Sequence, residues 1–415
     1  MSVRIWILVG VAASLVSMPA FAQTPDPQPH QHHQTGTPTG WHFMQDGLVL
    51  GLFNDQGGPR GGEEFKVPNW WMGMLSRQRG RHEFGLNMMF SLDPATVGEE
   101  GYREIFQVGE AFEGKPLIDR QHPHDLFMQL AAMWRVSFGE GSAFTLSGGP
   151  AGEPTLGPTA FMHRPSASNL VLAPLGHHTF DSTHISFGVL AASMDSGRWT
   201  FEGSVFNGRE PDEHRWDFDF GAMDSVAGRV WFRPAPGWEA QVSTGYLRDP
   251  EELTPGNAVR TTASIAWLKQ DGADFRALAI GYGVNAAHEE RRHGIFGEYS
   301  FEKGPNGLSG RVEFQQVETA VLLTGGIPDD HHDAVPPALV TAISLAGTRR
   351  FLTVRGFEAA LGAQVVFHVT PDVLSDTHGE FPVSWQAFLR LRLPTGTMGR
   401  MWNMRMSQAH RMAPQ

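Results

Sequence analysis

The chain has 415 residues, a formal net charge of −12, 18% charged residues and no cysteine. The acidic balance argues against a nucleic-acid partner, and the lack of cysteine excludes a disulfide-stapled fold. After the N-terminal region, no window has the roughly 18 consecutive apolar residues that a membrane-spanning helix needs, which also excludes a helical membrane protein.

The first residues, 1–22, have the pattern of a secretory signal peptide. Arg4 is followed by an apolar run from Ile5 to Val16 and then by Ala20-Phe21-Ala22, a cleavage sequence of small residues. The next stretch, 23–40, is rich in His, Pro and Gln, so it cannot bury enough apolar surface to offset the entropy lost on ordering. We therefore expect an exported protein with a disordered leader.

From residue 41 onward the chain alternates apolar and polar residues with the period of two that β-strands have. In 294–303, for example, Ile295 and Tyr299 share one face, and Glu298 and Ser300 share the other. The regular candidates are 80–90, 126–138, 183–193, 198–206, 226–232, 238–246, 261–267, 275–284, 294–303, 307–318, 356–369 and 384–393, and the less regular ones are 41–53, 67–77, 143–149 and 338–349. The sequence thus predicts an all-β protein of about sixteen strands.

The connections between these strands alternate between short and long. The short ones are 77–80, 139–142, 195–197, 234–237, 270–273, 303–306 and a tight link near Phe351; the long ones are 54–66, 92–125, 150–182, 207–221, 248–257, 286–291, 320–337 and 370–382. This alternation predicts that 41–394 form a transmembrane antiparallel up-and-down β-barrel with short periplasmic turns and long extracellular loops. An even strand count would place both termini in the periplasm.

The two faces of the strands support a membrane barrel over a soluble fold. Aromatic residues on the apolar face flank the short turns and would form an interfacial girdle; they are Phe138, Trp199, Phe232, Trp238, Trp267 and Phe301. The other face carries charges such as Glu298 and Arg311, which we expect to line a water-filled lumen. A soluble β-sandwich or four-bladed propeller is the alternative, but it would have to bury these charges between sheets.

These features resemble the bacterial porin-like outer-membrane β-barrels over nearly the whole chain after the leader. The phrases LIDRQHPHDLF (117–127) and PLGHHTFDSTHISFG (174–188) are also similar to segments of a group of outer-membrane proteins with no assigned substrate. The resemblance implies a location in the outer membrane of a Gram-negative bacterium, where lipid, lipopolysaccharide and the assembly machinery are partners. Barrels of this family usually end on an aromatic residue of the last strand, whereas a Met- and Arg-rich tail, 395–415, follows here. No oligomeric state follows from the pattern.

The two longest loops, 92–125 and 150–182, are expected to fold into the lumen of a porin-like channel for passive diffusion of small polar solutes or ions. The candidate constriction residues are Asp119, Arg120, His122, His124, Asp125, His163, Arg164, Arg311, Glu313, Arg390 and Arg392. The alternative for Asp119, Arg120 and Asp125 is that they only pin their loop by ion pairs and caps.

A second possible function is a barrel that binds or transports a transition metal such as copper. The candidate ligands are His177, His178, His184, His331 and His332, because imidazoles beside carboxylates suit zinc, copper or nickel. Their spacings match no closed metal motif, so no resident cofactor is predicted.

An enzyme is not expected. His184 and Ser186 share a strand face, and the surrounding sequence is similar to the His-x-Ser-Asn-Gly motif of outer-membrane phospholipases, with Phe187 in place of Asn. If the apolar side formed by Ile185 and Phe187 faces lipid, both groups point into the lumen, whereas a lipase needs its nucleophile at the lipid surface.

Overall fold

The structure is a computed structural model that describes residues 40–252, 256–287, 290–326 and 335–394. The predicted signal peptide, the leader up to residue 39 and the C-terminal tail lie outside the described residues, as do His331 and His332. The described helices are short, namely α2 (Asp93–Thr96), α3 (His177–Phe180), α4 (Thr319–Thr324) and α5 (Asp372–His378). None of the described helices is long and apolar enough to cross a membrane.

Most of the described chain is β-strand. The strands are β1 (Trp41–Gln56), β2 (Gly62–Lys66), β3 (Asn69–Arg79), β4 (His82–Phe90), β5 (Tyr102–Phe112), β6 (Lys115–Gln121), β7 (Phe127–Gly139), β8 (Ser142–Gly152), β9 (Ser186–Ser196), β10 (Trp199–Phe206), β11 (Ser225–Phe232), β12 (Trp238–Leu247), β13 (Ala258–Asp271), β14 (Asp274–Ala287), β15 (Glu290–Lys303), β16 (Asn306–Val317), β17 (Ala338–Val354), β18 (Phe357–Val369) and β19 (Val383–Arg392).

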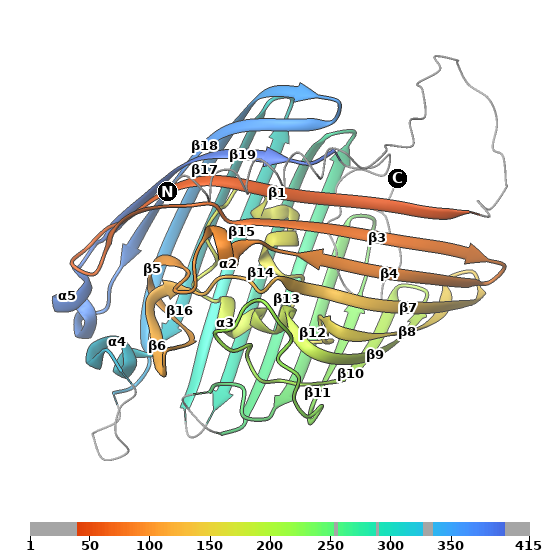
Figure 1. Ribbon diagram of the computed structural model, residues 1–415, viewed down its shortest axis with the longest axis horizontal. Helices are drawn as coiled ribbons and strands as arrows, with labels where there is room; N and C mark the ends of the chain where they lie inside the picture. The colour runs from red at the N-terminus through yellow and green to blue at the C-terminus, as the bar shows by residue number, and fades with distance from the viewer. Residues whose placement is uncertain (1–39, 253–255, 288–289, 327–334, 395–415) are drawn as a thin grey trace. The chain divides into compact units, whose positions relative to one another are not determined.

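One antiparallel sheet closes on itself, because β1 pairs with β19 along one edge and with β2 and β3 along the other. β2 and β3 share one strand position, interrupted at Val67 and Pro68. The other strands of this sheet pair in chain order, and β7 follows β4 because β5 and β6 form a separate hairpin. The predicted up-and-down barrel of sixteen strand positions is confirmed (Figure 1).

The alternation of short and long connections is also confirmed, with three corrections. β2 lies within the predicted loop 54–66, and only two residues separate β14 from β15 where a loop at 286–291 was expected. The tight link predicted near Phe351 lies instead at Arg355 and Gly356. Their φ angles of 52° and 84° are both positive, as a two-residue hairpin turn of type I′ requires.

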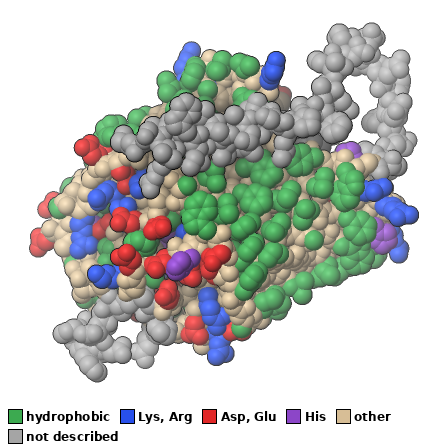
Figure 2. Space-filling model, viewed as in Figure 1, with side chains coloured by type: hydrophobic (Ala, Val, Ile, Leu, Met, Phe, Trp, Pro, Cys, Tyr) green, Lys and Arg blue, Asp and Glu red, His purple; other side chains and the backbone are tan. Residues whose placement is uncertain are grey.

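The outer wall of the barrel is apolar and has aromatic residues near the short turns. Trp199 lies opposite Phe232 with ring centroids 4.3 Å apart, and Trp238 lies opposite Trp267 at 6.2 Å. Figure 2 shows hydrophobic side chains covering the visible wall between two ends that carry charged groups. This is the arrangement of a barrel whose wall contacts lipid and whose rim carries an aromatic girdle.

The predicted facing of β9 is wrong. The face of Phe187, Val189 and Ala191 was expected to point outward, but Val189 and Ala191 are 3% and 2% exposed, whereas Leu190 is 46% exposed. Val189 and Ala191 point inward and pack in one cluster with Leu156. The apolar face was misassigned because part of the barrel interior is itself apolar.

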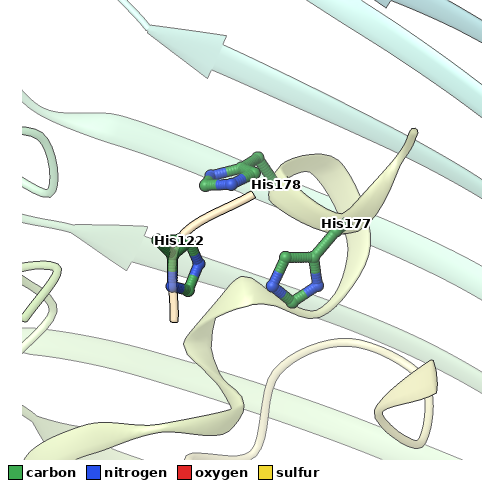
Figure 3. A group of neighbouring side chains, drawn as sticks. All are labelled: His122, His177 and His178. Atoms are coloured by element: carbon green, nitrogen blue, oxygen red, sulfur yellow. The ribbon is translucent and has the colours of Figure 1, made fainter. Parts of the chain in front are cut away.

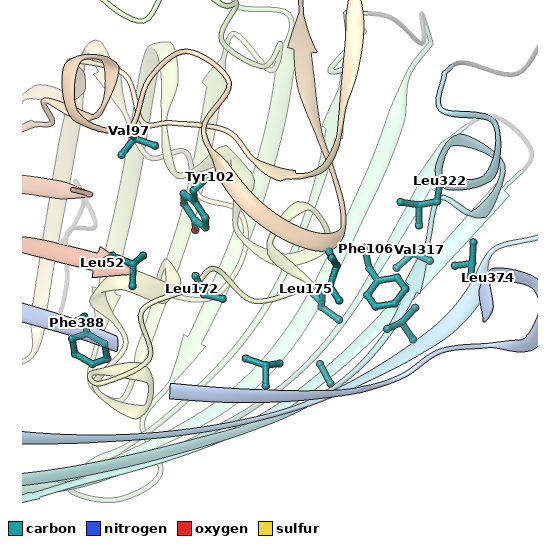
Figure 4. Packing of buried hydrophobic residues seen from close by; sticks show 14 of the residues in the cluster. Leu52, Val97, Tyr102, Phe106, Leu172, Leu175, Val317, Leu322, Leu374 and Phe388 are labelled. Atoms are coloured by element: carbon teal, nitrogen blue, oxygen red, sulfur yellow. The ribbon is translucent and has the colours of Figure 1, made fainter. Parts of the chain in front are cut away.

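The interior at the long-loop end is packed with side chains from wall and loops (Figure 4). Leu52 of β1 and Phe388 of β19 form one cluster with loop residues that include Tyr102, Phe106 and Leu175. A second cluster is rich in methionine and contains Met72, Met74, Met89 and Met128. The long loops thus bring apolar surface into the barrel, where burial is favourable.

The expected water-lined position of the luminal charges is therefore wrong for the described chain. Glu298 and Arg311 point inward as predicted, and so does Arg229, but these three residues are only 1%, 3% and 2% exposed. Burial at this level requires ion-pair and hydrogen-bond partners, because an unpaired buried charge costs several kcal/mol. Neighbouring wall strands supply some of those partners, such as Glu202 for Arg229, and loop residues supply the others.

Candidate functional site inside the barrel

The chain between β8 and β9 folds into the barrel, and we call residues 153–185 the inward segment. Prolines at 154, 158, 165 and 174 prevent it from continuing as a regular strand or helix. Its groups are hydrogen-bonded to each strand from β10 to β19 through, in strand order, Ser204, Arg229, Ser243, Arg260, Asn285, Glu298, Ser309, Thr348, Gln364 and Arg390. The segment therefore lies across the lumen and is anchored around more than half of the wall.

Arg164 is the central anchor of the inward segment. Its Nε and Nη2 donate to the two carboxylate oxygens of Glu298, each at 3.0 Å, and its Nη1 donates to Asp181 at 3.0 Å. Ser166 donates to Glu298 at 2.9 Å, and Arg311 Nη1 lies 3.7 Å from the same carboxylate. Burial alone would lower the pKa of Arg164, but the carboxylates of Glu298 and Asp181 raise it above its ordinary value. The guanidinium therefore stays charged.

Arg311 and Glu313 of β16 hold the next part of the segment. Arg311 Nη2 donates to the carbonyl oxygens of Leu172 and Ala173 at 3.3 and 3.0 Å, and its Nε lies 2.9 Å from Glu313. Glu313 accepts a hydrogen bond from the Gly176 backbone N–H at 3.3 Å. These two wall charges bind protein groups of the segment.

Arg390 and Arg392 of β19 act in the same way. Both donate to the carbonyl oxygen of Ser168, at 3.2 and 3.0 Å, and Arg390 also donates to Asn169 Oδ1 at 2.7 Å. All four wall residues singled out from the sequence therefore contact the inward segment.

Asp119 joins three separate parts of the long-loop end. Its φ of 55° places it in the left-handed region, where Oδ1 accepts hydrogen bonds from the Phe106 N–H at 2.8 Å and from His378 Nε2 at 3.0 Å. Oδ2 accepts from Arg60 Nη1 at 3.2 Å. These contacts pin the β5–β6 hairpin to its neighbours.

Arg120 and Asp125 also make pinning contacts. Arg120 Nε donates to the carbonyl oxygen of Glu100 at 2.7 Å, and Asp125 lies 3.3 Å from Nη1 of the buried Arg215. Arg215 pairs with Glu110 as well. A role of Asp119, Arg120 or Asp125 in solute selection stays a prediction.

Five histidines from the two longest loops meet inside the barrel. His122 and His124 follow β6, His177 and His178 belong to α3, and His184 ends the following 3-10 turn. The ring centroid of His122 lies 6.0 Å from that of His177 and 5.7 Å from that of His178. The ring centroids of His177 and His184 are 5.3 Å apart. Figure 3 shows His122 close to His177 and His178 of α3.

Burial determines the charge of these groups. It lowers the pKa of His122 well below its ordinary value and lowers that of His184 to about 3, so both imidazoles are neutral near pH 7. Burial also lowers the pKa of His163, to about 3, and its ring lies 5.3 Å from Trp70. For Asp181 burial acts to raise the pKa, but the hydrogen bond from His177 and nearby positive charge hold it at about 2. Asp181 therefore stays an anion beside His177 and His184.

The pair considered as catalytic is bound to backbone groups. Ser186 Oγ donates to the carbonyl oxygen of Thr183 at 3.2 Å, and His184 Nδ1 lies 2.8 Å from the carbonyl oxygen of Asp181. Ser186 is itself buried, at 2% exposure.

The sequence did not single out Glu298 as an anchor, and it missed Arg215 and Glu110. The periodicity of β15 placed Glu298 on the luminal face, which was a usable signal. Arg215 is the one Lys or Arg in the acidic stretch 210–220, a weak sign of a buried ion-pair partner.

The sequence matches no protein-family model and no curated protein at a significant level. The fold is similar to OprB of Pseudomonas putida in a high-pH structure, with a TM-score of 0.52 and 11% identity over 85% of this chain and 94% of that chain. It is also similar to an anion-selective porin from Comamonas acidovorans, with a TM-score of 0.51 and 10% identity over 85% of this chain and 100% of that chain. Together with the closed antiparallel sheet, these likenesses show that the chain has the fold of the bacterial porins.

Proposed function

We propose that this chain is a porin-like channel in the outer membrane of a Gram-negative bacterium, and that its inward segment narrows the passage. Passive diffusion of small polar solutes or ions is the transport that such a passage supports. The observation that carries the proposal is the inward segment hydrogen-bonded to each strand from β10 to β19 inside a closed barrel. The apolar outer wall supports contact with lipid.

The narrowing follows from the packing of the interior. A barrel of about sixteen strands encloses an aqueous channel unless its own chain fills it. Here the wall charges are buried against the inward segment, and Arg164, Glu298 and Arg311 form a network of both signs. A solute must pass the remaining space beside this segment, so we expect a small conductance and selection by size.

The proposed orientation places the short turns in the periplasm and the long loops outside the cell. The first residue of β1 and the last residue of β19 are at the short-turn end, because β1 runs from there to the first long connection and β19 returns from the last one. Both termini would then be periplasmic, and the long loops would face lipopolysaccharide.

The proposal is tested by single-channel conductance of the refolded mature chain in a planar bilayer. We expect discrete steps that scale with salt concentration and are smaller than those of a sixteen-stranded general-diffusion porin in the same membrane. A complete lack of steps at any voltage would overturn the channel function. Steps as large as those of the reference porin would overturn the narrowing by the inward segment.

A further inference from the structure

The histidine cluster has the arrangement of a metal site. It is formed where the segment after β6, with His122 and His124, meets α3 and the 3-10 turn after it, with His177, His178 and His184. These two segments are far apart in the sequence and belong to different long loops. Their meeting inside the barrel gathers side chains of the type that binds borderline transition metals.

The partners of the Nδ1 atoms fix the tautomers of the rings. Nδ1 of His177 lies 2.8 Å from a carboxylate oxygen of Asp181, Nδ1 of His184 lies 2.8 Å from the Asp181 carbonyl oxygen, and Nδ1 of His122 lies 3.2 Å from the Pro123 carbonyl oxygen. Because these oxygens only accept, Nδ1 of His177 and Nδ1 of His184 carry the proton, which leaves Nε2 of each ring with the lone pair. A carboxylate or carbonyl behind the ring is the usual second shell of a metal-binding histidine.

Several of the remaining ring nitrogens have no hydrogen-bond partner. Nε2 of His122, Nε2 of His178 and Nε2 of His184 are buried and form no hydrogen bond within the described chain. His122 is itself only 7% exposed. Buried acceptors without protein partners are uncommon and costly, and a water molecule or an ion is a usual partner for them.

Three of the rings come together closely enough for one ion. His122, His177 and His178 each offer one ring nitrogen, and these atoms all lie within 4.8 Å of one another (Figure 3). Bonds of about 2.0–2.1 Å to a tetrahedral metal place ligand nitrogens roughly 3.4 Å apart, so a small inward shift of the rings is sufficient.

Two acidic groups lie beside the rings, the buried Glu110 and the partly exposed Glu210. A carboxylate oxygen of Glu110 is 3.5 Å from His122 Nε2, and a carboxylate oxygen of Glu210 is 3.5 Å from His178 Nδ1. They provide negative charge next to a cation, although Glu110 also pairs with Arg215. Hard cations such as Ca²⁺ or Mg²⁺ prefer a shell of oxygen ligands, which imidazole rings do not offer.

We propose that His122, His177 and His178 form a binding site for one divalent transition metal ion, of the class of Zn²⁺ or Cu²⁺, inside the barrel. Asp181 fixes the orientation of the His177 ring through its contact with Nδ1, and His184 is the nearest additional imidazole. The bound ion would join the segment after β6 to the inward segment and so stabilise the packed interior. This site does not depend on the conduction of solutes, and its test is separate from conductance.

The test is titration of the refolded full-length mature chain with Zn²⁺ and with Cu²⁺, followed by calorimetry and, for Cu²⁺, by electron paramagnetic resonance. His30, His32 and His33 are replaced by alanine in every variant, so that the leader does not contribute metal ligands. We expect one ion per chain, a dissociation constant of roughly micromolar or below, and a Cu²⁺ spectrum with nitrogen ligands. The double variant His122→Ala/His178→Ala should weaken binding by about a hundredfold or more.

The matched control is His42→Ala/His293→Ala, which removes two exposed histidines of the barrel and should leave binding unchanged. The single variant His178→Gln, which keeps a polar side chain of similar size, guards against misfolding of the double variant and should still weaken binding at least tenfold. The proposal is wrong if the parent chain, which carries only the three leader substitutions, binds neither metal. It is equally wrong if one-ion binding survives both the double variant and His178→Gln with unchanged affinity.

Discussion

Replacing Glu298 with alanine should lower the free energy of unfolding of the barrel by about 3–5 kcal/mol, the usual cost of removing one partner of a buried ion pair. The side chain of Glu298 is fully buried, and its carboxylate binds Arg164 and Ser166 and faces Arg311. Without it, two buried guanidinium groups lose their shared counter-ion and repel each other. Arg164 stays protonated, so loss of its charge does not relieve this repulsion.

The change is measured by urea-dependent unfolding from lipid vesicles, with tryptophan fluorescence as the signal. Glu290→Ala is the matched control, because Glu290 belongs to the same strand but is exposed at its end. We expect an effect within about 0.5 kcal/mol for this control. Glu298→Gln keeps the hydrogen-bond acceptor and should lie between the two. Equal stability of Glu298→Ala and Glu290→Ala would show that the Arg164 anchor does not stabilise the barrel.

Removing residues 158–180 and joining Gly157 to Asp181 by a short Gly-Ser linker should give the largest change in conductance. The deletion removes Arg164 and the part of the inward segment that crosses the lumen, while the wall strands remain intact. A sixteen-stranded barrel without this filling leaves an aqueous channel, so we expect the single-channel conductance to rise roughly fivefold or more. We also expect the deletion variant to admit larger solutes than the wild type does.

Arg164→Glu provides a second route to the same result if the deletion variant does not refold. This change places a carboxylate against Glu298 and Asp181, which releases the segment by repulsion without removing its apolar residues. We expect larger or more frequent open events than in the wild type. A deletion variant that folds and conducts like the wild type would mean that solutes do not pass through the space of the inward segment.

The strands and their order could be predicted because each depends on local sequence. A strand in a barrel wall alternates apolar and polar residues and ends at a turn. The residues 294–303 and 307–318 alone are therefore sufficient to predict β15 and β16. The face of β9 was misread for a physical reason. Val189 and Ala191 are apolar because they pack on Leu156 inside the barrel, and period alone does not distinguish that surface from lipid.

The candidate site was only partly predictable. The histidines and the wall arginines were visible as residue types, but their partners come from remote parts of the chain. Arg164 and Glu298 are 134 positions apart, and Asp119 and His378 are 259 apart. Such pairs follow from how the loops fold into the lumen, which no local pattern encodes. For the same reason, the sequence does not predict that His122 lies close to the histidines of α3.

The position of the inward segment is tested most directly by a cross-link to the wall. The chain has no cysteine, so cysteines introduced at Asn169 and Ser309, whose side-chain nitrogen and oxygen lie 3.1 Å apart, report only on each other. A control pair combines the cysteine at Asn169 with one at Leu308, the adjacent residue that is 51% exposed on the outer wall. We predict that a short thiol-specific cross-linker joins the first pair efficiently in the refolded barrel and does not join the control pair. Failure of the first pair to cross-link in a folded barrel, or equal cross-linking of both pairs, would contradict an inward segment that lies across the lumen.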